Sequence, residues 1–407
     1  RGRRARPPPE ELAAARCDPW RGAPPGRACS SSARPPDVQL SARRYEALLD
    51  AEIMHFARAK LHPITLRDIL GQKDVAAFRE FLLEELPIRY ARRLHLLESM
   101  PQWKDFPHLK VIRSLYADAF RRLRDISLSG EERFRTTLEY IRRKNSNMLP
   151  HVVRGTRAMK KSLQLDDERV NDFLDDFLTG TIGTDILSSQ YLAMTRPGNP
   201  TSVIDPQCDP VNVVRAAAEE AKRLCMHHYG RAPPVEVVDI GQVRFPFISG
   251  YLNYIMLELL KNSLRAVTER HVDRARVGEH PVRVVVCGDE RIVVVRVSDC
   301  GGGIPPESLP KVWSYLYTTA TAQGEDALSD GDSDEEPPMA GFGCGLPLSR
   351  NYATYAGGSL ALNTMYGYGT DAYLYLNRLG DSQEVVEVEP RAALPCRGFV
   401  PRADPVR

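Results

Sequence analysis

The sequence predicts an α + α/β protein in which an antiparallel helical bundle precedes an α/β sandwich. Three observations support this fold class. Apolar residues recur at helical spacing from about residue 42 to 195, β-branched strands alternate with helical stretches after residue 212, and four polar or glycine-rich motifs lie between those strands. The first half is therefore expected to be a scaffold, and the second half is expected to hold a site.

Composition sets the limits of this interpretation. The chain has 407 residues, of which 43% are hydrophobic and 27% are charged, so it is long enough for two domains with sizeable cores. A formal net charge of +2 argues against a nucleic-acid binder driven by bulk charge. No apolar run approaches the roughly 20 residues that span a bilayer. The eight cysteines show no CxxC spacing, which indicates free thiols in a reducing compartment.

Residues 1–41 form an Arg/Pro-rich leader with few acids. The arginine bias is typical of an organelle transit peptide, but the run Pro7–Pro9 would interrupt the amphipathic helix that such peptides form. A disordered tail is the equal alternative.

Residues 42–195 are expected to form the bundle. Apolar residues from Tyr45 to Phe56 recur at helical spacing, and Pro63 ends that run. Further helices are expected over 74–99, 108–126, 131–161 and 166–193. Long helices joined by short polar turns favour antiparallel packing, with one apolar stripe per helix facing inward.

Two polar features of the bundle have a structural interpretation. His151 lies near a turn and has no acidic neighbour in the sequence, so a phosphohistidine relay is not expected there. Arg89, Arg92 and Arg93 indicate a helix face solvated by its own charges, with a contact for an acidic partner as the alternative.

Residues 196–212 are dense in Pro, Gly and Asx and predict a linker that holds at most a short hairpin. Within the domain expected over 213–380, a helix is predicted over 210–228 and a second one around Glu258. Strands are predicted over 235–239, 282–287, 291–298, 359–364 and 371–377. This pattern predicts a mixed sheet with helices on one face, followed by a tail over 381–407.

The first motif of the second half places a carboxylate and an amide on one helix face. Glu258 and Asn262 lie four residues apart in an amphipathic run, so both side chains point to one place. An isolated pair of this kind is usually a solvated surface. The motifs that follow are what favour a site.

The second motif ends a strand. Asp299 follows a β-branched run, and Gly301 and Gly303 come directly after it, where the lack of a Cβ lets backbone approach a ligand. A third motif, Gly341 to Leu346, opens a helix whose N-terminal amides can receive phosphate. The last motif, Gly367 to Asp371, precedes a strand and contains Thr370.

In this order, the motifs resemble the ATP-binding domain shared by DNA gyrase, heat-shock chaperones, bacterial histidine kinases and MutL. This is the GHKL superfamily, with a Bergerat-type α/β sandwich. Within it, residues 314–320, 339–350 and 367–373 resemble the mitochondrial pyruvate dehydrogenase kinases. The resemblance runs from about residue 42 to 385 and implies a family function.

That function is a protein serine kinase that uses Mg–ATP to phosphorylate and inactivate the decarboxylase α subunit of the pyruvate dehydrogenase complex. The resemblance implies Glu258 as the catalytic base and Asn262 as a nucleotide and Mg²⁺ ligand. Asp299 is expected to accept a hydrogen bond from the adenine amine, with Thr370 behind it, and Arg265 or Lys261 is expected to offset negative charge. The remaining nucleotide contacts are expected from Gly301, Gly303, Thr318, Thr319, Gly341, Phe342, Gly343, Cys344, Gly345 and Leu346.

The resemblance also implies partners and a location. The bundle is expected to dock on the lipoyl domains of the acyltransferase core, the chain is expected to be a homodimer, and the mitochondrial matrix is the expected location. No nucleic acid and no membrane span are expected.

The segment between Thr318 and Met339 contains the acidic run 324–338, which is too polar to pack. The resemblance places the ATP lid of the superfamily here. We expect its centre to stay in solvent, because an acidic run beside an anionic nucleotide is unfavourable, and only 318–320 and 341–345 to contact ATP.

Two departures from the family pattern bear on substrate and assembly. Tyr254 stands where many members carry a histidine one turn before the glutamate, and this helix also resembles the branched-chain 2-oxoacid dehydrogenase kinases. After Gly380 there is no Asp–Trp pair of the kind that some animal members use between subunits. The branched-chain kinase and a non-catalytic ATP-gated scaffold therefore stay as alternatives to the pyruvate enzyme.

Overall fold

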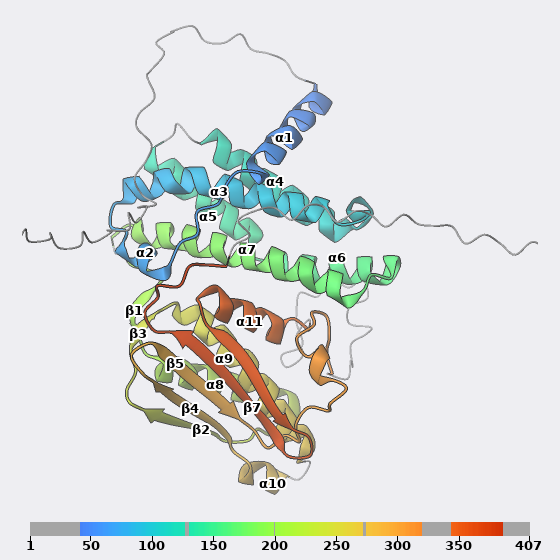
Figure 1. Ribbon diagram of the computed structural model, residues 1–407, viewed down its shortest axis with the longest axis vertical. Helices are drawn as coiled ribbons and strands as arrows, with labels where there is room; N and C mark the ends of the chain where they lie inside the picture. The colour runs from blue at the N-terminus through green and yellow to red at the C-terminus, as the bar shows by residue number, and fades with distance from the viewer. Residues whose placement is uncertain (1–40, 127–129, 199, 272–273, 320–342, 386–407) are drawn as a thin grey trace, which may run out of the picture. The chain divides into compact units, whose positions relative to one another are not determined.

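The computed structural model describes residues 41–126, 130–198, 200–271, 274–319 and 343–385. These residues form a run of helices that is followed by a mixed sheet with helices on one face (Figure 1). The predicted fold class is confirmed. Within the described ranges, the helices are all too short or too polar to cross a lipid bilayer.

The helical half begins close to where the apolar pattern begins. Its elements are α1 (Ala42–Ala57), α2 (Leu66–Gly71), α3 (Val75–Glu98), η1 (Trp103–Asp105), α4 (Pro107–Asp125), α5 (Glu131–Asn145), α6 (Met148–Leu163) and α7 (Asp167–Met194). Side-chain caps fix several starts: the Asp74 carboxylate accepts from the amides of Ala76 and Ala77, and Asp166 accepts from the amide of Arg169.

Two details of the predicted helices are wrong. The single helix expected over 131–161 is divided into α5 and α6, and Pro150 is the third residue of α6, where its missing N–H leaves no hydrogen bond unmade. His151 consequently lies within α6, and its Nδ1 is 2.9 Å from Nδ1 of His108 on α4. The short helix α2 was not predicted, although Thr65 and Asp68 form a capping box at its start.

The bundle core is aromatic. The ring of Tyr116 on α4 stacks on that of Phe177 on α7, with centroids 5.5 Å apart and planes 7° from parallel. Phe134 of α5 meets Tyr191 of α7 edge to face at 4.9 Å. All four side chains are buried, and each such burial stabilises the fold by about 1.5–3 kcal/mol.

The second half is built on a five-stranded sheet of order β2-β4-β5-β7-β6, in which only β2 and β4 are parallel. Its strands are β2 (Val235–Ile240), β4 (Val282–Gly288), β5 (Ile292–Ser298), β6 (Ser359–Met365) and β7 (Gly369–Asn377). Its helices are α8 (Pro210–Tyr229), α9 (Ser249–Arg270), α10 (Arg274–Glu279), η2 (Leu309–Lys311) and α11 (Gly345–Tyr355). All five predicted strands are confirmed to within two residues at each end.

The two faces of this sheet differ. Helices α8, α9 and α11 lie against one face (Figure 1), where Val284, Val297 and Ala372 stand in one register row and are buried. On the opposite face the row Val238, Val285, Arg296, Tyr373 and Ala361 has no covering element among the described residues. The neighbouring row on that face includes the exposed side chains of Ile240 and Tyr375.

The segment 196–212, which was predicted to be a linker, contains a strand that pairs outside this segment. β1 (Asp205–Cys208) pairs antiparallel with β3 (Phe245–Phe247), a strand that was not predicted. The short hairpin that the sequence allowed within 196–212 is therefore not what β1 forms. β3 has only three residues with a proline at its centre, which is too weak a pattern for a strand to be recognised.

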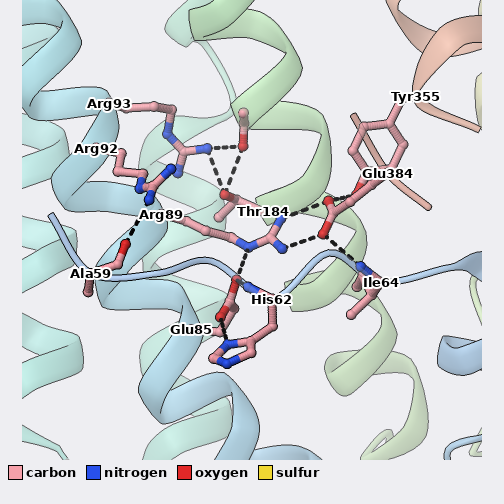
Figure 2. A network of polar contacts seen from close by, with 11 residues as sticks. Ala59, His62, Ile64, Glu85, Arg89, Arg92, Arg93, Thr184, Tyr355 and Glu384 are labelled. Carbon is pink, nitrogen blue, oxygen red and sulfur yellow. Dashed lines mark hydrogen bonds and ion pairs between the residues drawn. The ribbon is translucent and has the colours of Figure 1, made fainter. Parts of the chain in front are cut away.

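Two of the three arginines expected on a solvated face, Arg89 and Arg93, turn inward, and Arg92 is half-buried. Arg89 and Arg93 of α3 are only 4% and 3% exposed, so that expectation is wrong. Arg89 donates to Glu85 at 3.1 Å and to both oxygens of Glu384, beyond β7, at 2.9 and 2.5 Å (Figure 2). The hydroxyl of Tyr355, the last residue of α11, donates to the same Glu384 carboxylate. Burial disfavours the charge on Arg89, but the carboxylates outweigh it and its pKa lies above the usual value.

Gly183 of α7 makes room for this network. A Cβ at this position would lie 2.5 Å from Nη1 of Arg89, 2.8 Å from Oε2 of Glu384 and 2.9 Å from the hydroxyl of Tyr355. The three polar groups therefore meet against bare backbone.

Arg93 is held differently, because the groups that its guanidinium contacts are uncharged. Its guanidinium lies over the rings of Tyr90 and Tyr116, at 4.9 and 5.0 Å from their centroids. Its Nη1 donates to the carbonyl of Gly180 and to the hydroxyl of Thr184 on α7 (Figure 2). Burial lowers the pKa of Arg93.

Candidate active site

A cavity of about 400 Å³ opens between α9, the loop after β5 and the start of α11. Of the predicted site residues, it is lined by Glu258, Asn262, Arg265, Asp299, Gly303, Thr318, Thr319, Gly343, Gly345, Leu346 and Thr370. Four motifs that are far apart in the sequence thus contribute to one cavity.

Asp299 lies at the inner wall of the cavity and is 9% exposed. Its Oδ1 accepts from the amides of Gly301 at 2.9 Å and Thr370 at 3.3 Å, and its Oδ2 accepts from the hydroxyl of Ser263 at 3.0 Å. Burial raises the pKa of Asp299, and these donors partly oppose that rise. The carboxylate is thereby fixed in one orientation, with acceptor capacity left on the Oδ2 side.

The glycines after Asp299 lie so close to neighbouring segments that a side chain would not fit. At Gly303, with φ of +71°, a Cβ would lie 2.3 Å from the carbonyl of Met365. At Gly301 a Cβ would lie 2.4 Å from Cβ of Ala266 on α9. Gly301 is thus packed closely against α9, and it is not among the residues that line the cavity.

Glu258 is part of a charged pair that also lines the cavity. Its Oε1 accepts from the ammonium of Lys261 at 2.7 Å, and both side chains are 14% exposed. Its Oε2 lies 2.3 Å from where a Cβ of Gly345 would be, so only glycine fits at the first residue of α11. Glu258 therefore faces the N-terminus of α11, and Asn262 lies one turn further along the same helix face.

The start of α11 presents backbone N–H groups to the cavity. Gly345 and Leu346 are in its first turn, where amides have no intrahelical partner and an anion is favoured. Cys344 directly precedes this turn as the N-cap, but it is 3% exposed and does not line the cavity, so its predicted role is not supported. Gly341 and Phe342 lie outside the described residues, as does the segment 320–340 that contains the expected lid.

Arg265 connects the helix to the segment after η2. Its Nε donates to Glu269 at 3.0 Å and its Nη2 donates to the hydroxyl of Thr319 at 3.3 Å. Lys261 and Arg265 are the two cationic side chains in the described lining. Both cations line the same cavity as the first residues of α11, so a polyanionic ligand in the cavity would meet positive charge.

Several lining residues were not predicted. These are Leu259, Ser263, Ala266, Glu269, Ile304, Pro305, Ser308, Val312, Tyr317, Pro347, Leu362 and Ala372. Those on α9 fall on the stripe through Glu258 and Asn262, so spacing alone could have identified them. Leu362 and Ala372 face each other across β6 and β7, and their place depends on a register that the sequence does not state.

The cavity residues can hold a magnesium ion only if a bound nucleotide supplies further oxygen ligands. The described residues contain no group of three or more His, Cys, Asp or Glu side chains arranged for a metal. Asn262 offers one side-chain oxygen, and Mg²⁺ usually takes one or two protein oxygens together with water and phosphate oxygens. The donor set is therefore that of a metal which arrives with a nucleotide.

Two family models match the chain. Residues 63–214 match the one described as mitochondrial branched-chain alpha-ketoacid dehydrogenase kinase, and residues 249–379 match the histidine kinase-, DNA gyrase B- and HSP90-like ATPase. The first match covers most of the bundle, and the second covers the four motifs of the cavity.

Similar proteins agree with these models. The chain is 38% identical over 322 residues to a mitochondrial pyruvate dehydrogenase (acetyl-transferring) kinase of Arabidopsis thaliana, which spans 77% of this chain and 88% of the relative. It is 31% identical over 369 residues to isozyme 4 of that kinase from Mus musculus, across 84% of this chain and 87% of the relative. With this identity over nearly the full length of both relatives, the chain belongs to the family of the mitochondrial pyruvate dehydrogenase (acetyl-transferring) kinases, which are protein kinases with a GHKL-type ATPase domain.

Proposed function

We propose that this chain transfers the γ-phosphoryl group of Mg–ATP to a serine hydroxyl of the decarboxylase α subunit of the pyruvate dehydrogenase complex and thereby inactivates it. The observation that supports this most directly is the position of Glu258, whose carboxylate lies beside the first residue of α11, on the wall that also carries Asn262. A proton acceptor, a metal ligand and phosphate-receiving amides are then at one end of the cavity, and Asp299 is available to bind the adenine of the nucleotide.

At the adenine end, Asp299 accepts a hydrogen bond from the exocyclic amine. Its remaining acceptor capacity is on Oδ2, because Oδ1 already serves two backbone amides. Leu362 and Ala372 supply apolar surface for the ring. The buried carboxylate thus selects a ligand that brings a donor.

At the phosphate end, the amides of Gly345 and Leu346 receive phosphate oxygens, and Lys261 and Arg265 offset the charge. Magnesium supplies charge neutralisation between the phosphates when it is bound, with Asn262 as its protein ligand. The protein's contribution is therefore mostly positioning and electrostatics.

Glu258 takes the proton in the chemical step. The serine Oγ forms a bond to the γ-phosphorus, the bond from that phosphorus to the bridging oxygen of ADP breaks, and the serine proton passes to Glu258. The ammonium of Lys261 holds this carboxylate at 2.7 Å in the structure. When Lys261 turns toward a phosphate, the Glu258 carboxylate becomes free to accept the proton.

The pyruvate complex is favoured as the target by the similar proteins, which are named pyruvate dehydrogenase kinases in a plant, a mammal and a fission yeast. The branched-chain complex is the second candidate, because the model that matches residues 63–214 carries that name. A scaffold that binds ATP without phosphoryl transfer is the third.

Docking and assembly are a further part of the proposal. We propose that the bundle, taken as residues 42–195, docks on the lipoyl domains of the acyltransferase core, which raises the local concentration of the tethered decarboxylase. We also propose a homodimer. It is supported by the uncovered face of the sheet, where Ile240, Ile292 and Tyr375 are exposed and would be buried by a second copy.

The matrix of the mitochondrion is the proposed location, since the similar proteins are named mitochondrial. The proposed division of the chain is a leader over 1–41, the bundle over 42–195, a linker over 196–212, the kinase domain over 213–380 and a tail over 381–407.

One experiment separates the three candidates. The full chain is incubated with γ-labelled ATP, Mg²⁺ and either the purified pyruvate decarboxylase or the purified branched-chain decarboxylase. Label on the pyruvate enzyme supports the proposal, and label on the branched-chain enzyme alone moves the assignment to the second candidate. Nucleotide binding without label on either protein would leave the scaffold.

A further inference from the structure

Helix α7 belongs to the bundle, yet two of its side chains hold the backbone that leads into the cavity. Asn171 Oδ1 accepts from the amide of Tyr315 at 2.9 Å, and Asn171 Nδ2 donates to the hydroxyl of Ser314 at 3.1 Å. One turn further along α7, Oδ1 of Asp175 accepts from the hydroxyl of Tyr315 at 2.8 Å. Both ends of the tyrosine, its amide and its hydroxyl, are therefore bound by one face of α7.

Tyr315 also contacts the helix that opens at the cavity. Asn351 of α11 donates its amide to the tyrosine hydroxyl at 2.8 Å, and Arg350 lies 3.4 Å from the second oxygen of Asp175. The side chain of Tyr315 is 1% exposed. Its hydroxyl is thus a buried junction between α7 and α11, in which each partner fills a defined hydrogen-bonding role.

The residue after Tyr315 has a backbone conformation that needs support. Leu316 has φ of +67°, in the left-handed region that a side chain with a Cβ disfavours. Its amide donates at 3.0 Å to the carbonyl of Gly343, whose own φ is +76°. A Cβ on Gly343 would lie 2.8 Å from backbone atoms of Leu316 and Tyr317, so the two segments touch closely. Such a conformation persists where neighbouring contacts over-determine it.

The chain enters the cavity directly after this point. Tyr317, Thr318 and Thr319 line it, and so do Gly343 and Gly345 of the neighbouring segment. Because Leu316 joins Tyr315 to Tyr317, a change of its φ to the ordinary negative range would redirect those lining residues. The contacts that hold Tyr315 therefore determine the shape of the cavity wall.

We infer that Asn171 and Asp175 of the bundle are positioning residues for the nucleotide site, and that they act through Tyr315. The inference rests on the proposed function in taking a Mg–nucleotide as the ligand. It goes beyond that function in assigning a role in nucleotide affinity to residues that do not touch the cavity. The carboxylate and amide hold Tyr315, Tyr315 fixes the left-handed Leu316, and Leu316 sets Tyr317 to Thr319 against the start of α11.

The chain offers a matched control in Tyr355. Its hydroxyl is also buried and also donates to a carboxylate, that of Glu384 (Figure 2). Tyr355 is itself the last residue of α11, whereas Tyr315 contacts that helix through Asn351. Tyr315→Phe and Tyr355→Phe remove the same atom from the same kind of contact. A loss of packing or stability alone would affect both variants in the same way.

The test measures the affinity of the full-length chain for Mg–ADP by titration calorimetry, with thermal unfolding recorded alongside. We expect both variants to unfold at lower temperature, but only Tyr315→Phe to raise the Kd of Mg–ADP, on the order of tenfold. In turnover, the loss should fall on KM for ATP, with kcat at saturating ATP close to that of the wild type. A wild-type Kd in Tyr315→Phe, or an equal rise in both variants, would overturn the inference.

A second variant decides the matter if Tyr315→Phe does not fold. Asn171→Ala removes the contacts to Ser314 and to the Tyr315 amide from a half-buried surface of α7, and it should raise the Kd in the same way. An unchanged Kd in that variant refutes the inference. Failure of the proposed function is distinguishable: a wild-type chain that does not bind Mg–ADP refutes the nucleotide site itself, whereas equal binding by all variants refutes only the positioning role.

Discussion

Substituting Asp299 by asparagine changes one atom and a charge at the inner wall of the cavity. The asparagine oxygen can replace Oδ1, which accepts from two backbone amides at 2.9 and 3.3 Å, and its NH₂ then replaces Oδ2. The hydroxyl of Ser263 can reverse and accept from that NH₂, so the fold keeps its hydrogen bonds. The bound nucleotide loses its hydrogen bond, because the exocyclic amine of adenine now faces the NH₂ donor of asparagine in place of a carboxylate.

The magnitude follows from that single lost contact. A hydrogen bond to a charged group contributes about 1.5–3 kcal/mol, which corresponds to a rise in the Kd of Mg–ATP or Mg–ADP of roughly 10- to 150-fold. Titration calorimetry on the full chain measures it. Asp371→Asn is the control, since it removes the same charge from the neighbouring strand position, opposite Ser298, and Asp371 does not line the cavity. If Asp299→Asn binds nucleotide as tightly as Asp371→Asn, Asp299 does not contact the adenine amine.

Other substitutions test the remaining roles. Glu258→Gln should leave Mg–ATP affinity nearly unchanged and lower kcat by roughly 10²–10⁴-fold, because only proton acceptance is lost, and turnover near the wild-type rate would show that Glu258 is not the base. Asn262→Ala should weaken Mg²⁺-dependent binding and turnover together, which titrations with and without Mg²⁺ would reveal. Glu384→Gln should lower the free energy of unfolding by on the order of 3 kcal/mol in denaturant titrations, because it leaves Arg89 short of a buried counter-charge, and an unchanged midpoint would contradict this. Burial raises the pKa of Asp299 in the folded state above the unfolded value of about 3.8. The stability that protonation of Asp299 contributes is therefore present below pH 3.8 and is lost as the pH rises through the folded pKa. The asparagine does not titrate, so the stability of Asp299→Asn relative to wild type should increase with pH between these two pKa values.

Local patterns were sufficient for most elements of the fold. The β-branched runs around Val284 and Val295 and the capped helix starts at Asp74 and Asp166 carry their structure in a few neighbouring residues. The break between α5 and α6 was missed because a proline in a first helical turn was not weighed as a start signal. The strand at Phe245–Phe247 was missed because its partner lies about forty residues earlier, in a segment with no period.

In the candidate site as well, local motifs could be recognised from the sequence, whereas contacts between distant residues could not. Glu258, Asn262 and Asp299 could be proposed from motif chemistry, and the structure brings them to one cavity. The burial of Arg89 could not be inferred, because a helix face rich in arginine reads as solvated unless its counter-charge is known. One counter-charge, Glu85, lies one turn earlier on the same helix, but the carboxylate that accepts from both terminal nitrogens of Arg89 is Glu384, which is separated from it by 295 residues.

This separation has a consequence for synthesis on the ribosome. Arg89 leaves the exit tunnel long before Glu384 is translated, and until then the nascent bundle holds a guanidinium whose principal partner does not yet exist. With Glu85 but not yet Glu384 as a counter-charge, the guanidinium is short of acceptors, and the cost of burying it in that state should keep this part of α3 less tightly packed during translation. The last strand and the residues after it then complete the helical half as well as their own domain. An early stop codon before Glu384 would accordingly be felt in the first half of the protein, far from the site of truncation.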